Sequence, residues 1–199
     1  MQQEIKRYLL AKKVLNSGIK TLVEKILHPQ SSDLAKKIAT EQLKEALRNA
    51  KEPTYNPDRF WGNKVDVAFQ KLLNNPNSLA EFGLTLQKEE VPLLFYILFT
   101  EGVSVGGDAL AYGIGGFRDP SEAEYSSKFV SYFDFFEDLF IAFANGELKG
   151  KRVQVFLEER ETSWKAFLKE LPELIKRAEE EIHFLEKINK ELKLGEKHA

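Results

Sequence analysis

The stretch Pro120–Ala144, PSEAEYSSKFVSYFDFFEDLFIAFA, decides the expected fold. Read as a helix, it places a row of aromatic side chains on one broad face, at the spacing i, i+4, i+7, i+8, i+11, i+15, i+18. These side chains are Tyr125, Phe129, Tyr132, Phe133, Phe136, Phe140 and Phe143. Because aromatic rings bury large areas, this face can nucleate a core. Phe135 and Ile141 fall on the polar side, which indicates that a second surface is covered as well.

Both ends of this stretch carry typical helix-terminus residues. Asp119 is expected to be the N-cap, with Pro120 at the first helical position. At the other end Asn145 and Gly146 form a stop signal. The sequence therefore predicts a helix from Pro120 to Ala144.

The composition of the 199-residue chain is that of a soluble globular protein, with 43% hydrophobic and 30% charged residues. The absence of cysteine excludes disulfide scaffolds, thiolate zinc sites and a cysteine nucleophile, and fits a cytoplasmic location. The start, MQQEIKRYLLAKK, lacks the apolar core of a signal peptide. The longest uncharged apolar run, Val91–Thr100, is too short to span a bilayer. Abundant Lys and Glu with a single Met are compatible with a thermophilic source.

The N-terminal part, residues 1–51, is expected to form a pair of amphipathic helices. The first runs from Met1 to Leu27 and ends at His28-Pro29, because a residue before proline is disfavoured in the α region. The second runs from Asp33 to Ala50 after a cap at Ser31 or Ser32. Its expected inward residues are Leu34, Ile38, Leu43, Ala46 and Leu47.

The middle of the chain is expected to hold further helices and a glycine-rich segment. One helix is predicted from Pro57 to about Asn74, and a short one from Ser78 to about Gln87. Pro92 opens a segment that is apolar on every side and therefore buried all round. Several glycines follow between Gly102 and Gly116, and each costs a helix about 1 kcal/mol relative to alanine. A break at Gly106-Gly107 is the expectation. The segment then serves close helix packing or a hinge, with a ligand-contacting surface as the alternative.

The C-terminal part, residues 150–194, is expected to be a long helical arm. Apolar residues from Leu174 to Leu192 recur close to a heptad repeat, and Pro172 restarts or kinks the helix. A short strand at residues 153–157 is the alternative for its start. The whole chain, residues 1–199, is thus predicted to be a single-domain all-α bundle of about eight or nine helices, with residues 92–144 as its buried centre.

Charge is spread unevenly along the chain. Residues 1–51 carry eleven Lys/Arg and five Asp/Glu, a net of +6, whereas residues 52–147 carry six and fifteen, a net of −9. Two basic stripes on the N-terminal helices could neutralise phosphates or an acidic partner, although a solvated face is the more common case. Their residues are Lys6, Lys13, Lys20, Lys37, Lys44, Arg48 and Lys51.

Two short spacings in the C-terminal helix invite a catalytic interpretation. Glu180-x-x-His183 has the spacing found in di-iron carboxylate bundles, but the second Glu-x-x-His that such sites need is absent. Arg177 and His183 are spaced as in HEPN-type ribonucleases, and the resemblance covers only these two residues. Ala178 stands where that family usually has a polar residue. We therefore expect no metal, no cofactor and no catalysis.

Asp108, Tyr112 and Arg118 lie around the glycine segment and are the candidate ligand-binding residues. The function expected from the sequence is that of a helical protein that binds another macromolecule. Its contact surfaces would be the basic N-terminal face and the C-terminal helix, which could also self-associate, and nucleic acid is one candidate partner. The alternative is a small-molecule or metal-dependent function near residues 102–118.

Overall fold

The structure is a computed structural model of the chain, and it describes residues 5, 8, 9, 11, 12, 20–49, 62–105 and 128–192. The chain divides into two compact units. Unit 1 comprises Met1–Ile5 with Tyr55–Ala178, and unit 2 comprises Lys6–Thr54 with Glu179–Ala199. The single domain expected from the sequence stays a prediction.

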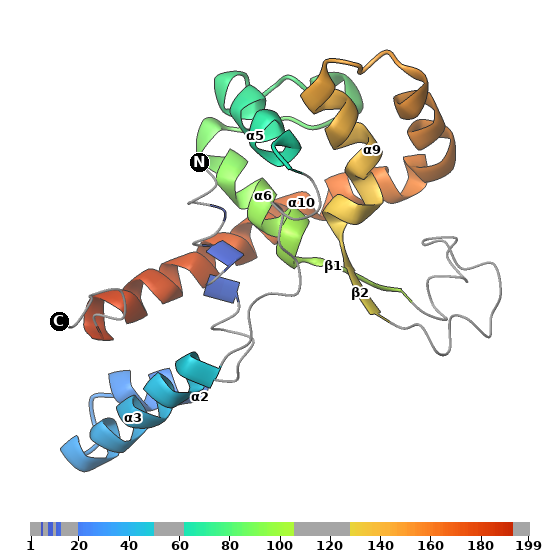
Figure 1. Ribbon diagram of the computed structural model, residues 1–199. Coiled ribbons are helices and arrows are strands. Elements are labelled where there is room, and N and C mark those ends of the chain that lie inside the picture. Colours follow the sequence, from blue (N-terminus) through green and yellow to red (C-terminus); the bar gives the residue numbers. More distant parts are fainter. Residues whose placement is uncertain are drawn as a thin grey trace, which may run out of the picture. The chain divides into compact units, whose positions relative to one another are not determined.

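A helical hairpin is the centre of unit 2. Helices α2 (Lys20–Leu27) and α3 (Asp33–Asn49) lie side by side (Figure 1). As expected, Ser32 caps α3, because its hydroxyl accepts a hydrogen bond from the Ala35 N–H at 3.1 Å. The buried core of the hairpin consists of Val23, Ile26, Ala39 and Leu43.

The last part of the long helix α10 (Lys151–Leu192) completes this core. Phe184 and Leu185 are half-buried and pack against the hairpin residues. A salt bridge of 2.9 Å between Lys12 Nζ and Glu181 Oε1 joins the two ends of the chain within unit 2. Unit 2 is therefore built from residues that are far apart in the sequence.

The prediction that Leu34 and Ile38 lie on the inward face of α3 is wrong. Leu34 and Ile38 are exposed, with 68% and 51% of their surfaces accessible, while Leu43 is fully buried. Leu34 and Leu43 are nine residues apart, and at about 100° per residue they point to opposite sides of a helix. The hairpin core uses the side of Leu43 and leaves Leu34 in solvent.

Unit 1 is built mainly from helices. They are α5 (Lys64–Asn74), the short 3₁₀ helices η1 (Ala80–Phe82) and η2 (Lys88–Glu90), α6 (Val91–Thr100), α9 (Tyr132–Asn145) and the first part of α10. The turn at Gly62 and Asn63 precedes α5, so the predicted continuous helix from Pro57 is wrong. A turn and η1 likewise replace most of the short helix predicted from Ser78.

Helix α6 is buried on every side, as its uniformly apolar sequence predicts. Its end differs from the expectation, because the helix stops at Thr100 and Gly102–Val105 forms strand β1. This strand pairs antiparallel with β2 (Lys128–Ser131), with Gly102 opposite Ser131. The predicted break at Gly106-Gly107 lies outside the described residues.

Helix α9 is the aromatic helix, but it is shorter than predicted. It begins at Tyr132 with Ser131 as its N-cap, and Phe129 belongs to β2 instead. The expected cap at Asp119 lies outside the described residues. The predicted stop is confirmed: Gly146 adopts a left-handed conformation with φ +74°, and its N–H donates to the carbonyl groups of Ala142 and Phe143.

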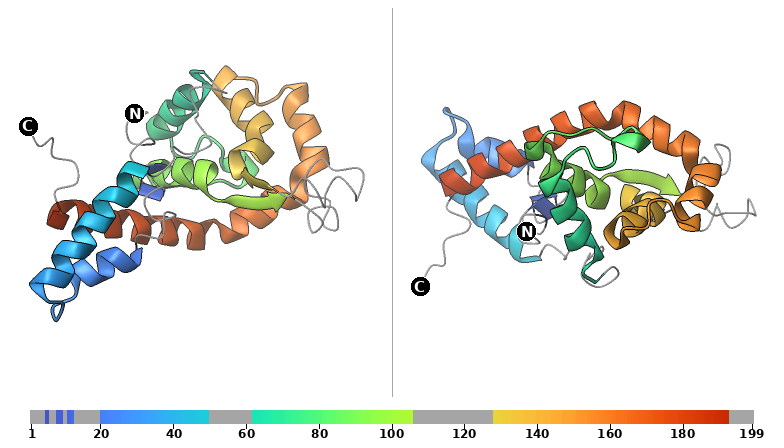
Figure 2. Two further views of the ribbon diagram at one scale, coloured as in Figure 1. Left: turned by 60° about the horizontal axis from the view of Figure 1, so that its bottom comes forward. Right: turned by 90° about the horizontal axis from the view of Figure 1, so that it is seen from above.

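The core of unit 1 is an aromatic cluster between α9 and α10. Phe136 is 1% exposed, and its ring lies 5.0 Å from Trp164 and 5.2 Å from Phe167 between centroids. The Trp164 Nε1–H donates to the Phe82 carbonyl at 2.7 Å, so the buried indole keeps its hydrogen bond. Figure 2 shows the first part of α10 beside α9, as these ring contacts require. Phe135 is also buried, which confirms that a second surface of α9 is covered.

Helix α10 is continuous over 42 residues, so the alternative strand at residues 153–157 is wrong. The helix also continues through Pro172, although a proline has no N–H to donate to the preceding turn. The described residues are thus mostly helical, in agreement with the predicted all-α class, with six α-helices, two 3₁₀ helices and one strand pair among them. In the same part of the chain, no helix combines the length and the apolar character needed to cross a membrane.

Candidate functional site

The structure describes the side chains of only some of the basic residues that are predicted to bind a partner. Lys20 at the start of α2 is exposed, and so are Lys37 and Lys44 on α3. The side chain of Arg48 and the whole of Lys6, Lys13 and Lys51 lie outside the described residues. Lys44 Nζ lies 3.3 Å from Glu41 Oε1, so this cation is already partly balanced on its own helix.

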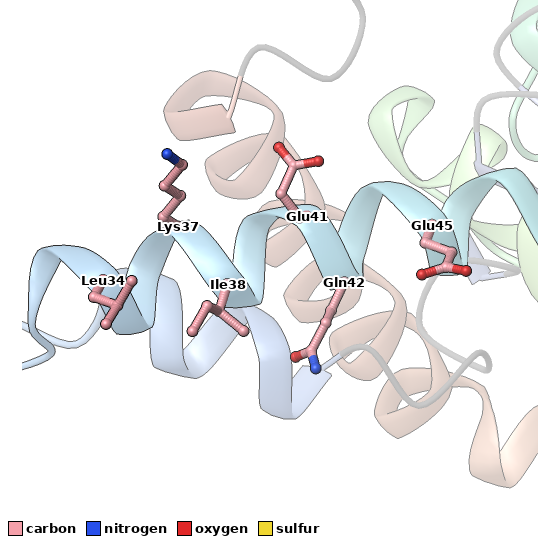
Figure 3. A pocket seen from close by; sticks show the side chains of 6 residues that line it. All are labelled: Leu34, Lys37, Ile38, Glu41, Gln42 and Glu45. Atoms are coloured by element: carbon pink, nitrogen blue, oxygen red, sulfur yellow. The ribbon is translucent and has the colours of Figure 1, made fainter.

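The exposed face of α3 carries apolar side chains beside charged ones. A shallow depression of about 430 Å³ runs along it, lined by Leu34, Lys37, Ile38, Glu41, Gln42 and Glu45. Figure 3 shows Lys37 and Glu41 along one edge of this face, and Leu34, Ile38 and Gln42 along the other. We name these six residues the α3 face. Leu34 and Ile38 are four residues apart on the helix, so they form one small apolar patch within the depression.

Asp108, Tyr112 and Arg118, the candidate ligand-binding residues near the glycine segment, lie outside the described residues. The small-molecule alternative at residues 102–118 therefore stays a prediction.

The residues with catalytic spacings in α10 lie in solvent. Arg177, Glu180 and His183 are all exposed. Within the described ranges, no group of three or more His, Cys, Asp or Glu side chains could hold a metal ion.

A smaller cleft lies in unit 1, between α9 and α10. It has a volume of about 110 Å³, and its lining is Tyr132, Phe135, Phe136, Ser163, Ala166, Phe167 and Glu170. The Tyr132 O–H donates a long hydrogen bond of 3.4 Å to Glu170 Oε2 at this site. Tyr132 also packs against Phe167, with 4.7 Å between the ring centroids.

The electrostatic environment of this cleft is acidic. The pKa of Tyr132 is raised to about 12, first by burial and then by the carboxylates of Glu170 and Glu101, while Arg177 acts in the opposite direction. A raised pKa means that a negative charge on the phenol is disfavoured here. Burial, the main cause, disfavours a charge of either sign, and the two carboxylates act specifically against a negative charge.

None of the candidate sites predicted from the sequence coincides with this cleft. Its signal is the spacing i, i+3, i+4 of Tyr132, Phe135 and Phe136 on one helix, and i, i+4, i+7 of Ser163, Phe167 and Glu170 on the other. Each set marks one helix face. The spacings do not predict that these two faces pack against each other, because this depends on tertiary packing.

Glu137 is the second group in unit 1 with a shifted pKa. Burial raises the pKa of this half-buried carboxyl, and the neighbouring Asp138 and Asp134 raise it further, while Arg160 and Arg152 oppose the shift. Arg152 Nη1 forms a salt bridge of 2.8 Å with Asp138 Oδ1. The Arg160 Nη1–H donates a hydrogen bond of 3.0 Å to the Phe135 carbonyl. At neutral pH the ionised Glu137 is therefore less favourable in the folded than in the unfolded chain.

Replacing Glu137 by glutamine should raise the stability of the protein at pH 7. The variant removes a charge that folding disfavours, so its urea midpoint is expected above that of the wild type. At about pH 3, below the ordinary pKa of Glu, the wild-type carboxyl is neutral in both states and the difference should vanish. Glu159→Gln, at an exposed position on α10, is the control and should change the midpoint little at either pH. A Glu137→Gln midpoint below that of the wild type at pH 7 would contradict the argument.

Comparison with known proteins gives no relative for this chain: no protein-family model, no curated protein and no solved structure matches it.

Proposed function

We propose that this chain is a non-catalytic, cytoplasmic binding protein that acts through macromolecular contacts, and that the α3 face is its contact surface. The observation that carries the proposal is the exposure of Leu34 and Ile38 within the depression on α3. Exposed aliphatic side chains lose contact with water when a partner covers them, at about 25 cal/mol per Å². Lys20, Lys37 and Lys44, which are exposed on the same hairpin, supply charge for the contact.

A protein partner fits the α3 face better than nucleic acid does. Glu41 and Glu45 line the same depression as Lys37, and a phosphate backbone would be repelled by these carboxylates. Leu34 and Ile38 offer neither hydrogen bonds to base edges nor rings for stacking. Charges of both signs beside an aliphatic pair are the pattern expected of a surface that receives another helix.

Lys37 and Glu41 of the α3 face can pair with each other across two copies of the helix, so the partner we propose is a second copy of the chain. In two antiparallel copies of α3 that cross at the level of Ala39, Lys37 of one copy lies level with Glu41 of the other, and the reverse pair forms as well. With 1.5 Å of rise per residue, the two Ile38 side chains are then offset by about 3 Å along the axis and meet at the centre.

The C-terminal helix, the other contact surface expected from the sequence, has less support. Leu171, Leu174, Ala178 and Ile182 are all buried within the chain. This part of the apolar row therefore offers no exposed strip to a second molecule, and self-association through it would require a rearrangement.

The proposed dimer should be weak. One helix face covers much less than the 1,200–2,000 Å² that stable protein interfaces typically bury. We expect a dimer in the micromolar range or weaker, whose population rises with protein concentration. Sedimentation equilibrium over a wide concentration range measures this directly.

Charge exchange on α3 gives the sharpest test. Lys37→Glu and Glu41→Lys should each weaken the dimer several-fold, because each places like charges at the same level of the two helices. The double variant Lys37→Glu/Glu41→Lys restores opposite charges and should recover the association. Glu24→Lys, an exposed change on α2, is the matched control and should leave the dimer unchanged. Circular dichroism verifies that each variant stays helical.

Two outcomes would overturn the second-copy proposal. A concentration-independent monomer shows that the α3 face does not pair with itself. A salt-sensitive shift of DNA or RNA that is lost in Lys37→Gln/Lys44→Gln/Arg48→Gln would assign the surface to nucleic acid instead.

A further inference from the structure

The cleft between α9 and α10 is too small for an ordinary ligand. Pockets for drug-sized molecules have volumes of about 300–1,000 Å³, whereas this cleft has about 110 Å³. A water molecule takes about 30 Å³ in the liquid, so the cleft holds a group of roughly four heavy atoms. A small head group fits, and a nucleotide or sugar does not.

The lining of the cleft combines aromatic rings with a carboxylate. Tyr132, Phe135, Phe136 and Phe167 come from both helices, and Glu170 contributes its charge at the same place. The three phenylalanines are at most 5% exposed, so their rings are held in fixed positions. The faces of aromatic rings carry partial negative charge and attract cations within about 6 Å.

The carboxylate of Glu170 can still receive a ligand. Its contact with the Tyr132 hydroxyl is 3.4 Å long, well beyond the 2.7–2.8 Å usual for a hydrogen bond between oxygens. A carboxylate has several acceptor positions, so this weak contact leaves room for a positive group. The nearby Glu101 adds negative potential, as its effect on the pKa of Tyr132 indicates.

The ring of Phe135 already accepts one cation in the folded chain. The guanidinium of Arg160 lies 5.7 Å from the centroid of that ring. Arg160 is not part of the cleft lining, so this contact leaves the cleft itself without a basic side chain among its lining residues. Arg177 also acts on Tyr132 from outside the lining, since its charge lowers the pKa of that phenol.

We propose that this cleft binds a methylated ammonium group. The methyl groups, which carry the spread positive charge, contact the aromatic side of the lining, where only Tyr132 is more than 5% exposed, and Glu170 supplies the opposite charge. A trimethylated ammonium has no N–H to donate, so cation–π contacts with the rings and the charge of Glu170 account for its selection over neutral groups. The group can come from a free small molecule or from a methylated lysine side chain, because both present the same head.

Binding of choline, compared with its uncharged carbon analogue 3,3-dimethylbutan-1-ol, tests the proposal. The two molecules have nearly the same shape and differ in charge. Titrations followed by NMR on the full chain should show choline binding at millimolar concentrations and the analogue at least about tenfold more weakly. Resonances of residues 132–136 and 163–170 should move. A peptide carrying one trimethyllysine, against the same peptide unmethylated, distinguishes the two sources.

Variants at Glu170 separate the charge from the shape of the cleft. Glu170→Gln should weaken choline binding about tenfold and leave the analogue unchanged, because only the charge is lost. Glu173→Gln, an exposed Glu→Gln change three residues further on, is the matched control and should bind like the wild type. Equal binding of choline and its analogue, no binding of either, or unchanged binding by Glu170→Gln would overturn the proposal.

Discussion

Replacing Phe136 by alanine is expected to lower the free energy of unfolding by about 3–5 kcal/mol, the range for deleting a buried phenylalanine ring. Phe136 is 1% exposed and lies at the centre of the aromatic cluster of unit 1. Its ring contacts Tyr132, Phe135, Phe156, Trp164 and Phe167. Urea unfolding monitored by tryptophan fluorescence measures the loss, since Trp164 reports on the cluster directly.

Leu34→Ala provides the matched control for this experiment. It also removes a large apolar side chain from a helix, but Leu34 is 68% exposed, so the urea midpoint should change little. If Phe136→Ala and Leu34→Ala lowered stability equally, the α9 face would not be the core that these ring contacts describe.

Replacing Gly102 by alanine is expected to cost about 3 kcal/mol, the upper end of the range for overpacking. A Cβ atom at this position would lie 1.9 Å from the Val130 carbonyl oxygen and 2.8 Å from the Ser131 Cα. Both atoms belong to the backbone of β2, so no side-chain rotation can relieve the contact. The strands must separate where Gly102 pairs with Ser131.

Gly146→Ala separates this steric effect from the cost of backbone conformation. Gly146 has φ +74°, but the nearest heavy atom to an added Cβ is Lys71 Nζ at 3.9 Å. The expected loss of stability then comes only from holding an alanine in the left-handed backbone conformation, which costs about 1–2 kcal/mol. The loss of stability should therefore be larger for Gly102→Ala than for Gly146→Ala. The reverse order would show that β1 and β2 do not approach each other as closely at Gly102.

The helical elements were predictable where one apolar face dominates the sequence. In α9 the ring spacing identified Phe133, Phe136 and Phe140 as core residues, and the position of Phe135 indicated a second covered surface. The burial of α6 could be predicted from its uniformly apolar sequence alone, because all sides of this helix are buried. The start of α9 was missed, since Phe129 continues the helical spacing of the rings but pairs with a strand that is distant in sequence.

The inward face of α3 could not be read from periodicity alone. The helix carries Leu34 and Ile38 on one side, and Ala39 and Leu43 on the other. Either set could face a neighbour, and the packing of α2 against Leu43 decides between them. The candidate contact surface of α3 follows from that tertiary choice, as does the cleft, whose two walls come from separate helices.

The composition of unit 2 from two distant segments sets the order in which the nascent chain can fold. All of Tyr55–Ala178 leaves the ribosome before Glu179 does, so unit 1 can form while synthesis continues. The α2–α3 hairpin is made before Tyr55–Ala178, but Phe184 and Leu185, which pack against it, are made after that segment. Glu181, the partner of Lys12, is likewise made 169 residues later. Contacts between residues so far apart in the sequence raise the contact order, and a high contact order slows folding. During translation, a hairpin that is made before Tyr55–Ala178 is thus completed only after that segment.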